Sequence, residues 1–316
     1  MNANLVIGEP NFVTVSCPVP STSSTASTVV GFPEGIAVDS GGNLWAADAY
    51  NNRVLEFAAT LSSGMPATLV IGQSNFTSLS TGTSNTTLDG PTGVAFDSSA
   101  NLWVADATNN RVLQYAPPFT TNMAATLVLG QANLNTGTAD SDPITGTISA
   151  RTLNTPTSLV FDGSGNLWVS DTVNHRVLQF SPPFTNGMPA SLVLGQTDFV
   201  SSSANQGGSA GPATLSAPKG MYFNGVTLFI GDTANNRTLG FTNPLINGVN
   251  ASLVLGQSDF ASTAANQGGT TPTATSQSDP FDAGASPIAL CVLAMLIAGW
   301  MAIRFHGGRK TQPGKE

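Results

Sequence analysis

The sequence predicts an all-β fold made of repeated units of four short strands. Two repeated blocks carry this prediction in the 316-residue chain: a block of 22 or 23 residues that occurs four times, and a shorter block that occurs five times. No window between residues 1 and 280 has the sustained 3.6-residue apolar period of a helix. The 33 glycines and 20 prolines fit a fold with many turns.

The longer block accounts for three strands of each unit. It reads GVAFDSSANLWVADATNNRVLQY at residues 93–115, and its other copies occupy residues 35–57, 158–180 and 220–241. Two short runs rich in Val, Phe and Trp are separated by a turn of Ser, Gly and Asn, and a third apolar run follows the sequence NNR.

The shorter block supplies the fourth strand. It reads LVLGQANL at residues 127–134 and recurs at 69–76, 192–199 and 253–260, with a fifth copy at 5–12. Four short strands in each unit of about 60 residues predict the blades of a β-propeller. One blade cannot bury both faces of its sheet, but stacked blades can.

The pattern P-x-G-[VI]-A-[VF]-D, N-L-W-V-A-D and N-[NH]-R-V-L-x-F resembles the NHL repeat. It recurs near residues 33–76, 91–134, 156–199 and 218–260, and the last copy diverges most, with Asn224 for Asp and Thr238 for Val. The resemblance implies a propeller that usually has six blades. We therefore expect residues 1–262 to form four NHL-like blades plus a surplus N-terminal strand at Leu5–Gly8, as in an incomplete propeller.

The C-terminal part predicts a membrane anchor. Residues 283–303 carry no charge, and a helix of that length rises about 31 Å, close to the thickness of the hydrocarbon core of a bilayer. We expect a flexible polar linker at 263–286, a single transmembrane helix at 287–304 and a basic tail at 305–316. A buried core helix is the alternative reading of the apolar run.

Charge asymmetry predicts the orientation of this anchor. Four of the ten basic residues follow the apolar run, which predicts a cytoplasmic tail and an extracytoplasmic propeller, a layout similar to bacterial C-terminal sorting tails. Residues 1–12 have no basic segment followed by an apolar one, as an export signal would. Either the N-terminus lies further upstream, or the protein is tail-anchored with a cytoplasmic propeller.

Charge and cysteine content disfavour one class of partner and exclude one kind of scaffold. Before residue 287 there are six basic residues against 17 acidic ones, a balance that disfavours nucleic-acid binding. The two cysteines, Cys17 and Cys291, lie far apart, so a disulfide framework is excluded.

The repeated charged and aromatic residues predict architecture rather than chemistry. An Asp ends each second strand and an Arg follows five residues later, and we expect the pair to brace the turn between them. In the first three units an Asp also ends the first strand, and we expect it to fix the turn that follows. We expect the Trp residues to pack between blades rather than to bind carbohydrate. These residues are Asp48, Arg53, Asp106, Arg111, Asp171, Arg176, Asp232, Arg237, Asp39, Asp97, Asp162, Trp45, Trp103 and Trp168. A calcium site in these loops is an alternative.

The chain has only two histidines and two cysteines, so few residues could support histidine- or cysteine-based catalysis. His175 occupies the Asn position of the turn and is expected to be structural, and His306 lies in the basic tail. No Ser-His-Asp set, paired Cys nucleophile or phosphate-binding Gly loop can be assembled. The sequence therefore identifies no catalytic residue, no metal ligand, no cofactor and no specific binding residue.

Our hypothesis is a membrane-tethered NHL propeller that is not an enzyme and acts as a ligand- or protein-binding scaffold. The expected partner is a protein or glycan on a loop face, since loops carry variable surfaces, and the loops at 135–155 and 200–217 are the first candidates. The alternative is a propeller lyase or hydrolase whose catalytic residues lie in blades missing from this chain.

Overall fold

The computed structural model describes residues 3–9, 11–13 and 27–269. Its strands form four separate four-stranded antiparallel sheets, each made of consecutive strands, which confirms the four predicted units. We number these sheets blades 1 to 4. Blade 1 contains β1 (Pro33–Val38), β2 (Leu44–Asp48), β3 (Arg53–Phe57) and β4 (Leu69–Ile71). Blade 2 contains β5 (Pro91–Phe96), β6 (Leu102–Asp106), β7 (Arg111–Tyr115) and β8 (Leu127–Leu129). Blade 3 contains β9 (Pro156–Phe161), β10 (Leu167–Asp171), β11 (Arg176–Phe180) and β12 (Leu192–Leu194). Blade 4 contains β13 (Pro218–Phe223), β14 (Thr227–Asp232), β15 (Arg237–Thr242) and β16 (Leu253–Leu255).

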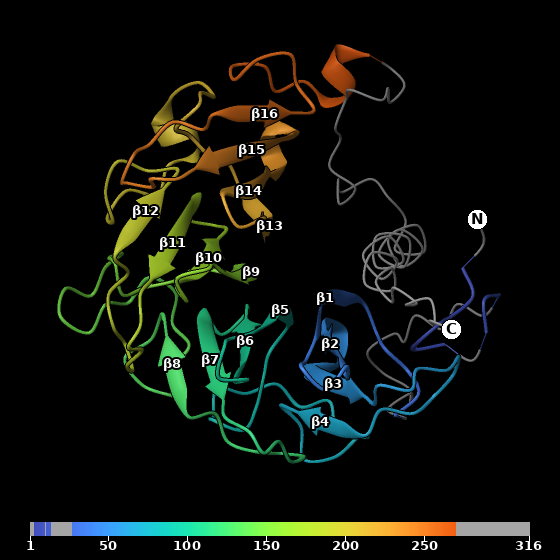
Figure 1. The fold of residues 1–316 in the computed structure, drawn as a ribbon. Helices are drawn as coiled ribbons and strands as arrows, with labels where there is room; N and C mark the ends of the chain where they lie inside the picture. The colour runs from blue at the N-terminus through green and yellow to red at the C-terminus, as the bar shows by residue number, and fades with distance from the viewer. Residues whose placement is uncertain (1–2, 10, 14–26, 270–316) are drawn as a thin grey trace, which may run out of the picture.

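The four blades lie in an arc around a common centre (Figure 1), with the first strand of each blade innermost. The inner strands contact one another in order, β1 with β5, β5 with β9 and β9 with β13. Glycine allows this close approach: a Cβ atom on Gly35 would lie 2.4 Å from the carbonyl oxygen of Thr92 in the next blade. The helices of the described residues are short 3-10 turns, such as η1 (Ala49–Asn51) and η3 (Thr233–Asn235).

The hydrophobic core lies between blades. Side chains alternate across each strand, so blades 2 and 3 each pack one apolar face on the blade before and the other on the blade after. Trp45 and Val54 of blade 1 share one cluster with Leu113 and Tyr115 of blade 2, and two further clusters join blades 2, 3 and 4 in the same way. Neighbouring blades therefore bury each other's apolar faces, as expected for stacked repeats.

The N-terminal copy of the short block corrects one prediction. Residues 5–8 do not form the expected strand, because no neighbouring strand among the described residues pairs with them. They nevertheless dock on blade 1, where the Gly64 amide donates to the Val6 carbonyl at 3.2 Å. The Asn122 amide makes the equivalent bond to Val70 at 3.1 Å. Residues 5–8 therefore occupy the place that the outer strand of a preceding blade would take.

Blade 4 differs from the others at its outer strand. Leu253 and Leu255 are 40% and 47% exposed, whereas Leu192 and Leu194 at the same register in blade 3 are 8% and 0% exposed. No further blade covers this face within the described part of the chain.

The start of the predicted linker contacts blade 4. The Thr263 carbonyl accepts a bond from Asn236, and the Ala264 carbonyl accepts one from Gln257, so these residues pack with the blade. The predicted anchor at 287–304, the tail at 305–316, His306 and both cysteines lie outside the described residues. Over the residues that the structure does describe, it contains no helix with the length and apolar character needed to cross a bilayer.

Candidate functional site

The blade-to-blade loops share one end of the molecule with the turns between second and third strands. Because the strands of each blade alternate in direction, these segments all lie on one face, which we call the loop face. Counted from the recurring Gln that follows the Gly after each outer strand, its loops span residues 73–90, 131–155 and 196–217. The loops at 135–155 and 200–217, the predicted partner surface, therefore belong to one face.

A buried ion pair lies beneath the loop face in every blade. The Asp that ends the second strand and the Arg that begins the third are cross-strand neighbours, and the Arg Nε lies 2.7 Å from the Asp Oδ2 in all four blades. All eight side chains are fully buried. The pairs are Asp48–Arg53, Asp106–Arg111, Asp171–Arg176 and Asp232–Arg237.

Each carboxylate holds the loop that enters its blade, which corrects the predicted turn contact. Asp106 accepts the backbone N–H of Asp89 at 2.7 Å, 17 residues upstream, and Asp171 accepts that of Asn154 at 2.6 Å. The turn itself is closed by its own backbone bond, so it needs no N–H acceptor from the Asp. It contributes only an Asn side chain, such as Asn109, which donates to the carboxylate at 2.9 Å.

The guanidinium group joins the loops before and after its blade. Arg111 donates its Nε–H to Asp106, and its two terminal nitrogens donate to four loop carbonyls at 2.6–3.0 Å. All five donors of the group are thereby used. The carbonyls belong to Thr83, Ser84 and Thr87 in the loop before blade 2 and Leu134 in the loop after it.

Burial and hydrogen bonding have opposite effects on the Asp106 carboxylate. Burial raises the pKa of Asp106 to about 6, and the Arg111 guanidinium opposes that rise. Since every group around the carboxylate donates a hydrogen bond, the ionised form fits the site. The pairs therefore act as braces of the loop face.

His175 has the structural role that the sequence predicts. Its Nδ1 accepts the Ala217 amide at 2.9 Å, and the Asn52 and Asn110 side chains accept the equivalent amides at 2.9 Å. Burial lowers the pKa of His175, with Asp232 opposing, and the neutral ring is the form that can accept this bond. His175 thus ties blade 3 to the end of the loop that enters blade 4.

A buried glutamine is a further element that sequence reasoning missed. The Gln of the LVxGQ block donates from its Nε2 to two carbonyls, for example Gln131 to Asn110 at 3.0 Å and to Thr138 at 2.9 Å. The sequence does indicate its importance, because this Gln recurs in the four copies of the short block that follow a longer block. The equivalents are Gln73, Gln196 and Gln257.

The first-strand Asp and the Trp meet on the opposite face, and both predicted roles are confirmed. Asp97 accepts two backbone amides of its turn at 2.9 Å and the Trp103 indole N–H at 2.9 Å. Trp103 also packs edge-on against Phe161 and Phe184 of blade 3, with ring centroids 5.9 and 4.8 Å away. Blade 4 replaces Asp and Trp together, by Asn224 and Phe229.

The longest loop presents an exposed apolar residue on the loop face. Pro156 follows Gln131 by 25 positions, whereas Pro91 follows Gln73 by 18 and Pro218 follows Gln196 by 22. Buried Asp142 accepts the Ile144 amide at 2.7 Å and the Thr145 amide at 3.0 Å. This turn leaves the Ile144 side chain 79% exposed.

The described residues contain no group of three His, Cys, Asp or Glu side chains placed to hold a metal ion. The repeated Asp residues take part in the bonds described above.

A family model described as "NHL repeat" matches residues 31–57, 88–115 and 153–180, which fall in blades 1 to 3. No curated protein sequence matches the chain.

Several solved structures are similar to this chain at low sequence identity. They include a virginiamycin B lyase from Staphylococcus aureus (15% identity, TM-score 0.37, 63% of this chain and 47% of that one). Another is a gluconolactonase from Xanthomonas campestris (16% identity, TM-score 0.43, 71% of this chain and 62% of that one). A third is a nidogen/laminin complex (20% identity, TM-score 0.43, 67% of this chain and 60% of that one). The chain spans less than two thirds of each of them, and the fold alone does not distinguish binding from catalysis. The chain thus contains three segments that match the NHL repeat, and its described residues form four four-stranded antiparallel sheets, an arrangement consistent with a β-propeller.

Proposed function

We propose that this chain is a binding module that docks a protein partner on its loop face. The observation that carries the proposal is the fixation of all three loops to the blades by buried side chains. Loops held in one conformation lose little entropy on binding, which favours affinity. Buried Arg111 and Arg176 fix both ends of the 131–155 loop.

Ile144 is the proposed anchor on this face. It projects from a turn that Asp142 holds, and it is the most exposed large apolar side chain between residues 27 and 269. Exposed apolar groups on rigid turns suit pockets of a protein partner, because their burial removes apolar surface from water at little entropic cost. Full burial of one Ile side chain stabilises a complex by about 2 kcal/mol.

Site-specific photo-cross-linking in cells tests the proposal. A photoreactive residue at position 144 is expected to give one discrete adduct with a partner protein. The matched control is position 38, where Val38 is 63% exposed at the opposite end of β1. The same adduct from both positions, or none from position 144, would contradict docking on the loop face.

We also propose that residues 287–304 tether the module to a membrane with the propeller outside. The uncharged run, its length and the basic residues after it support this part of the proposal. The full chain should sediment with membranes, and a chain ending at residue 286 should not. External protease should cut the propeller in intact cells. A propeller cut only after the cells are permeabilised would instead indicate the tail-anchored cytoplasmic topology.

A further inference from the structure

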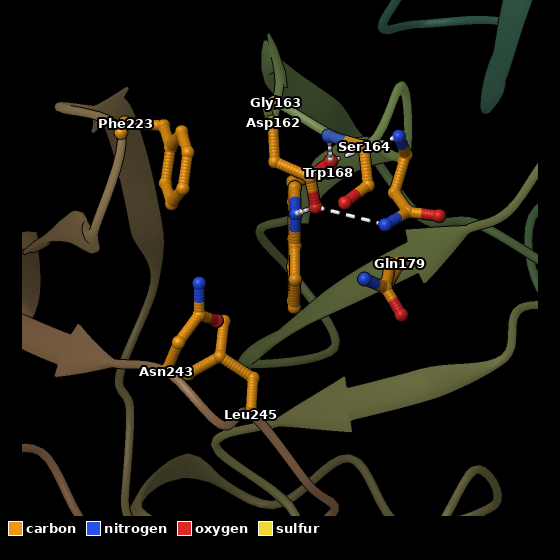
Figure 2. A pocket seen from close by; sticks show the side chains of 10 residues that line it. Asp162, Gly163, Ser164, Trp168, Gln179, Phe223, Asn243 and Leu245 are labelled. Carbon is orange, nitrogen blue, oxygen red and sulfur yellow. Dashed lines mark hydrogen bonds between the residues drawn. The ribbon is translucent and has the colours of Figure 1, made fainter.

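A pocket of about 360 Å³ lies between blades 3 and 4, on the face opposite the loop face (Figure 2). One wall comes from blade 3, with the turn after β9 and Trp168 on β10. The other wall comes from blade 4, with Phe223 at the end of β13 and the loop after β15. The pocket is thus built from two blades and is separate from the loop-face site.

The pocket is present here because one aromatic ring is missing. At the blade 1–2 interface three rings pack together, with Phe119 4.9 Å from Trp45 and 6.2 Å from Phe96. The blade 2–3 interface repeats this arrangement with Trp103, Phe161 and Phe184. At the blade 3–4 interface Leu245 takes the position of Phe119 and Phe184.

A second change in the same loop adds a polar group. Asn243 stands where the other two loops have Pro117 and Pro182. Its amide points into the space between the Phe223 and Trp168 rings (Figure 2). Among the described residues, the Asn243 side chain makes no hydrogen bond, and the Nε2 of Gln179 in the same lining donates none.

The chemistry of the lining favours a neutral ligand. Asp162 is the one ionisable side chain in it, and its oxygens already accept four hydrogen bonds, from Ser164, Asn166 (backbone and side chain) and Trp168. A cation would have to displace these donors, and the carboxylate repels an anion. The groups left to recognise a ligand are the half-buried Phe223 ring, the Leu245 side chain and neutral amides.

We propose that this pocket binds a neutral pyranose sugar. The apolar face of the sugar ring takes the place of the missing phenyl ring and packs on Phe223, while its hydroxyl groups bond to Asn243 and the other amides. Trp168 is only 1% exposed, so it forms the floor of the pocket rather than a stacking surface.

Titration of the full chain with a panel of neutral monosaccharides, followed by ligand-observed NMR and calorimetry, tests this proposal. We expect saturable binding of at least one sugar. Leu245→Phe restores the third ring and should abolish binding. Asn243→Ala should weaken binding about tenfold, the effect of one hydrogen bond. Ile246→Ser, in the same loop but outside the pocket lining, is the control and should bind like the wild type.

Three results would overturn the proposal. These are no saturable binding of any sugar in the panel, unchanged binding by Leu245→Phe, or binding only of aromatic probes such as phenol and indole. The last result would mean that an aromatic side chain of a partner fills the pocket. Unfolding curves separate these results from misfolding, because Leu245→Phe fills space and should be at least as stable as the wild type. The outcome is independent of cross-linking at position 144.

Discussion

Replacement of Arg111 by Met is the sharpest test of the braces beneath the loop face. The side chain is fully buried, and its five donors bond to the Asp106 carboxylate and four loop carbonyls. Removal of one partner from a buried ion pair costs about 3–5 kcal/mol, because the other charge is left buried and unpaired. Globular domains are stable by about 5–15 kcal/mol, so Arg111→Met should remove a large fraction of the total.

Denaturant unfolding at pH 7, followed by fluorescence of the buried tryptophans, measures this loss. Arg151→Met is the matched control, since Arg151 lies in the 131–155 loop and is only partly buried, and it should change stability by less than about 0.5 kcal/mol. The double variant Asp106→Leu/Arg111→Met should be more stable than Arg111→Met alone, because neither charge remains. If Arg111→Met unfolds at the same denaturant concentration as Arg151→Met, the brace is refuted.

Three further predictions concern single bonds and backbone positions. Burial lowers the folded-state pKa of His175 below 6.5, so its contribution to stability is present above pH 6.5 and is lost as the pH falls. His175→Asn, which restores the residue of the other blades, should reduce this pH dependence in unfolding curves at pH 7.5 and 5.5. Gly130→Ala should cost about 2 kcal/mol, because φ is +85° and the new Cβ would lie 2.5 Å from a leucine side chain. Gly146→Ala, with φ +69° and open space around it, should cost only about 1 kcal/mol. Asp162→Asn and Trp168→Phe should show a coupling of about 1 kcal/mol in a double-mutant cycle, since they share a 3.0 Å hydrogen bond; no coupling would contradict that bond.

Local pattern was sufficient to predict the strands of the four blades and several of the polar contacts, but it also predicted a strand at residues 5–8 that does not form. The Asp97 turn contacts and the packing of Trp103 both follow from residues that recur at one register. His175 could be assigned because it replaces an Asn that recurs in the other blades. Each of these inferences needed only the comparison of one repeat with another.

Contacts between distant segments could not be predicted in the same way. The bond from the Asp89 amide to Asp106 depends on the path of an irregular loop, which no periodicity describes. The role of Gln131 likewise appears only when the turn and the loop are both placed. The sequence shows Leu245 in place of a phenylalanine, but which tryptophan it faces depends on the stacking of blades 3 and 4.

The central claim is that a protein partner docks on the loop face. The affinity of the cross-linked partner for purified variants tests this claim most directly. Loss of about 2 kcal/mol of binding free energy from apolar burial predicts that Ile144→Ser binds about 30-fold more weakly than the wild type. Val38→Ser, on the opposite face, should bind with unchanged affinity. Calorimetry gives both values under one set of conditions. Equal affinities for the wild type and Ile144→Ser would contradict docking of a protein partner through the 131–155 loop.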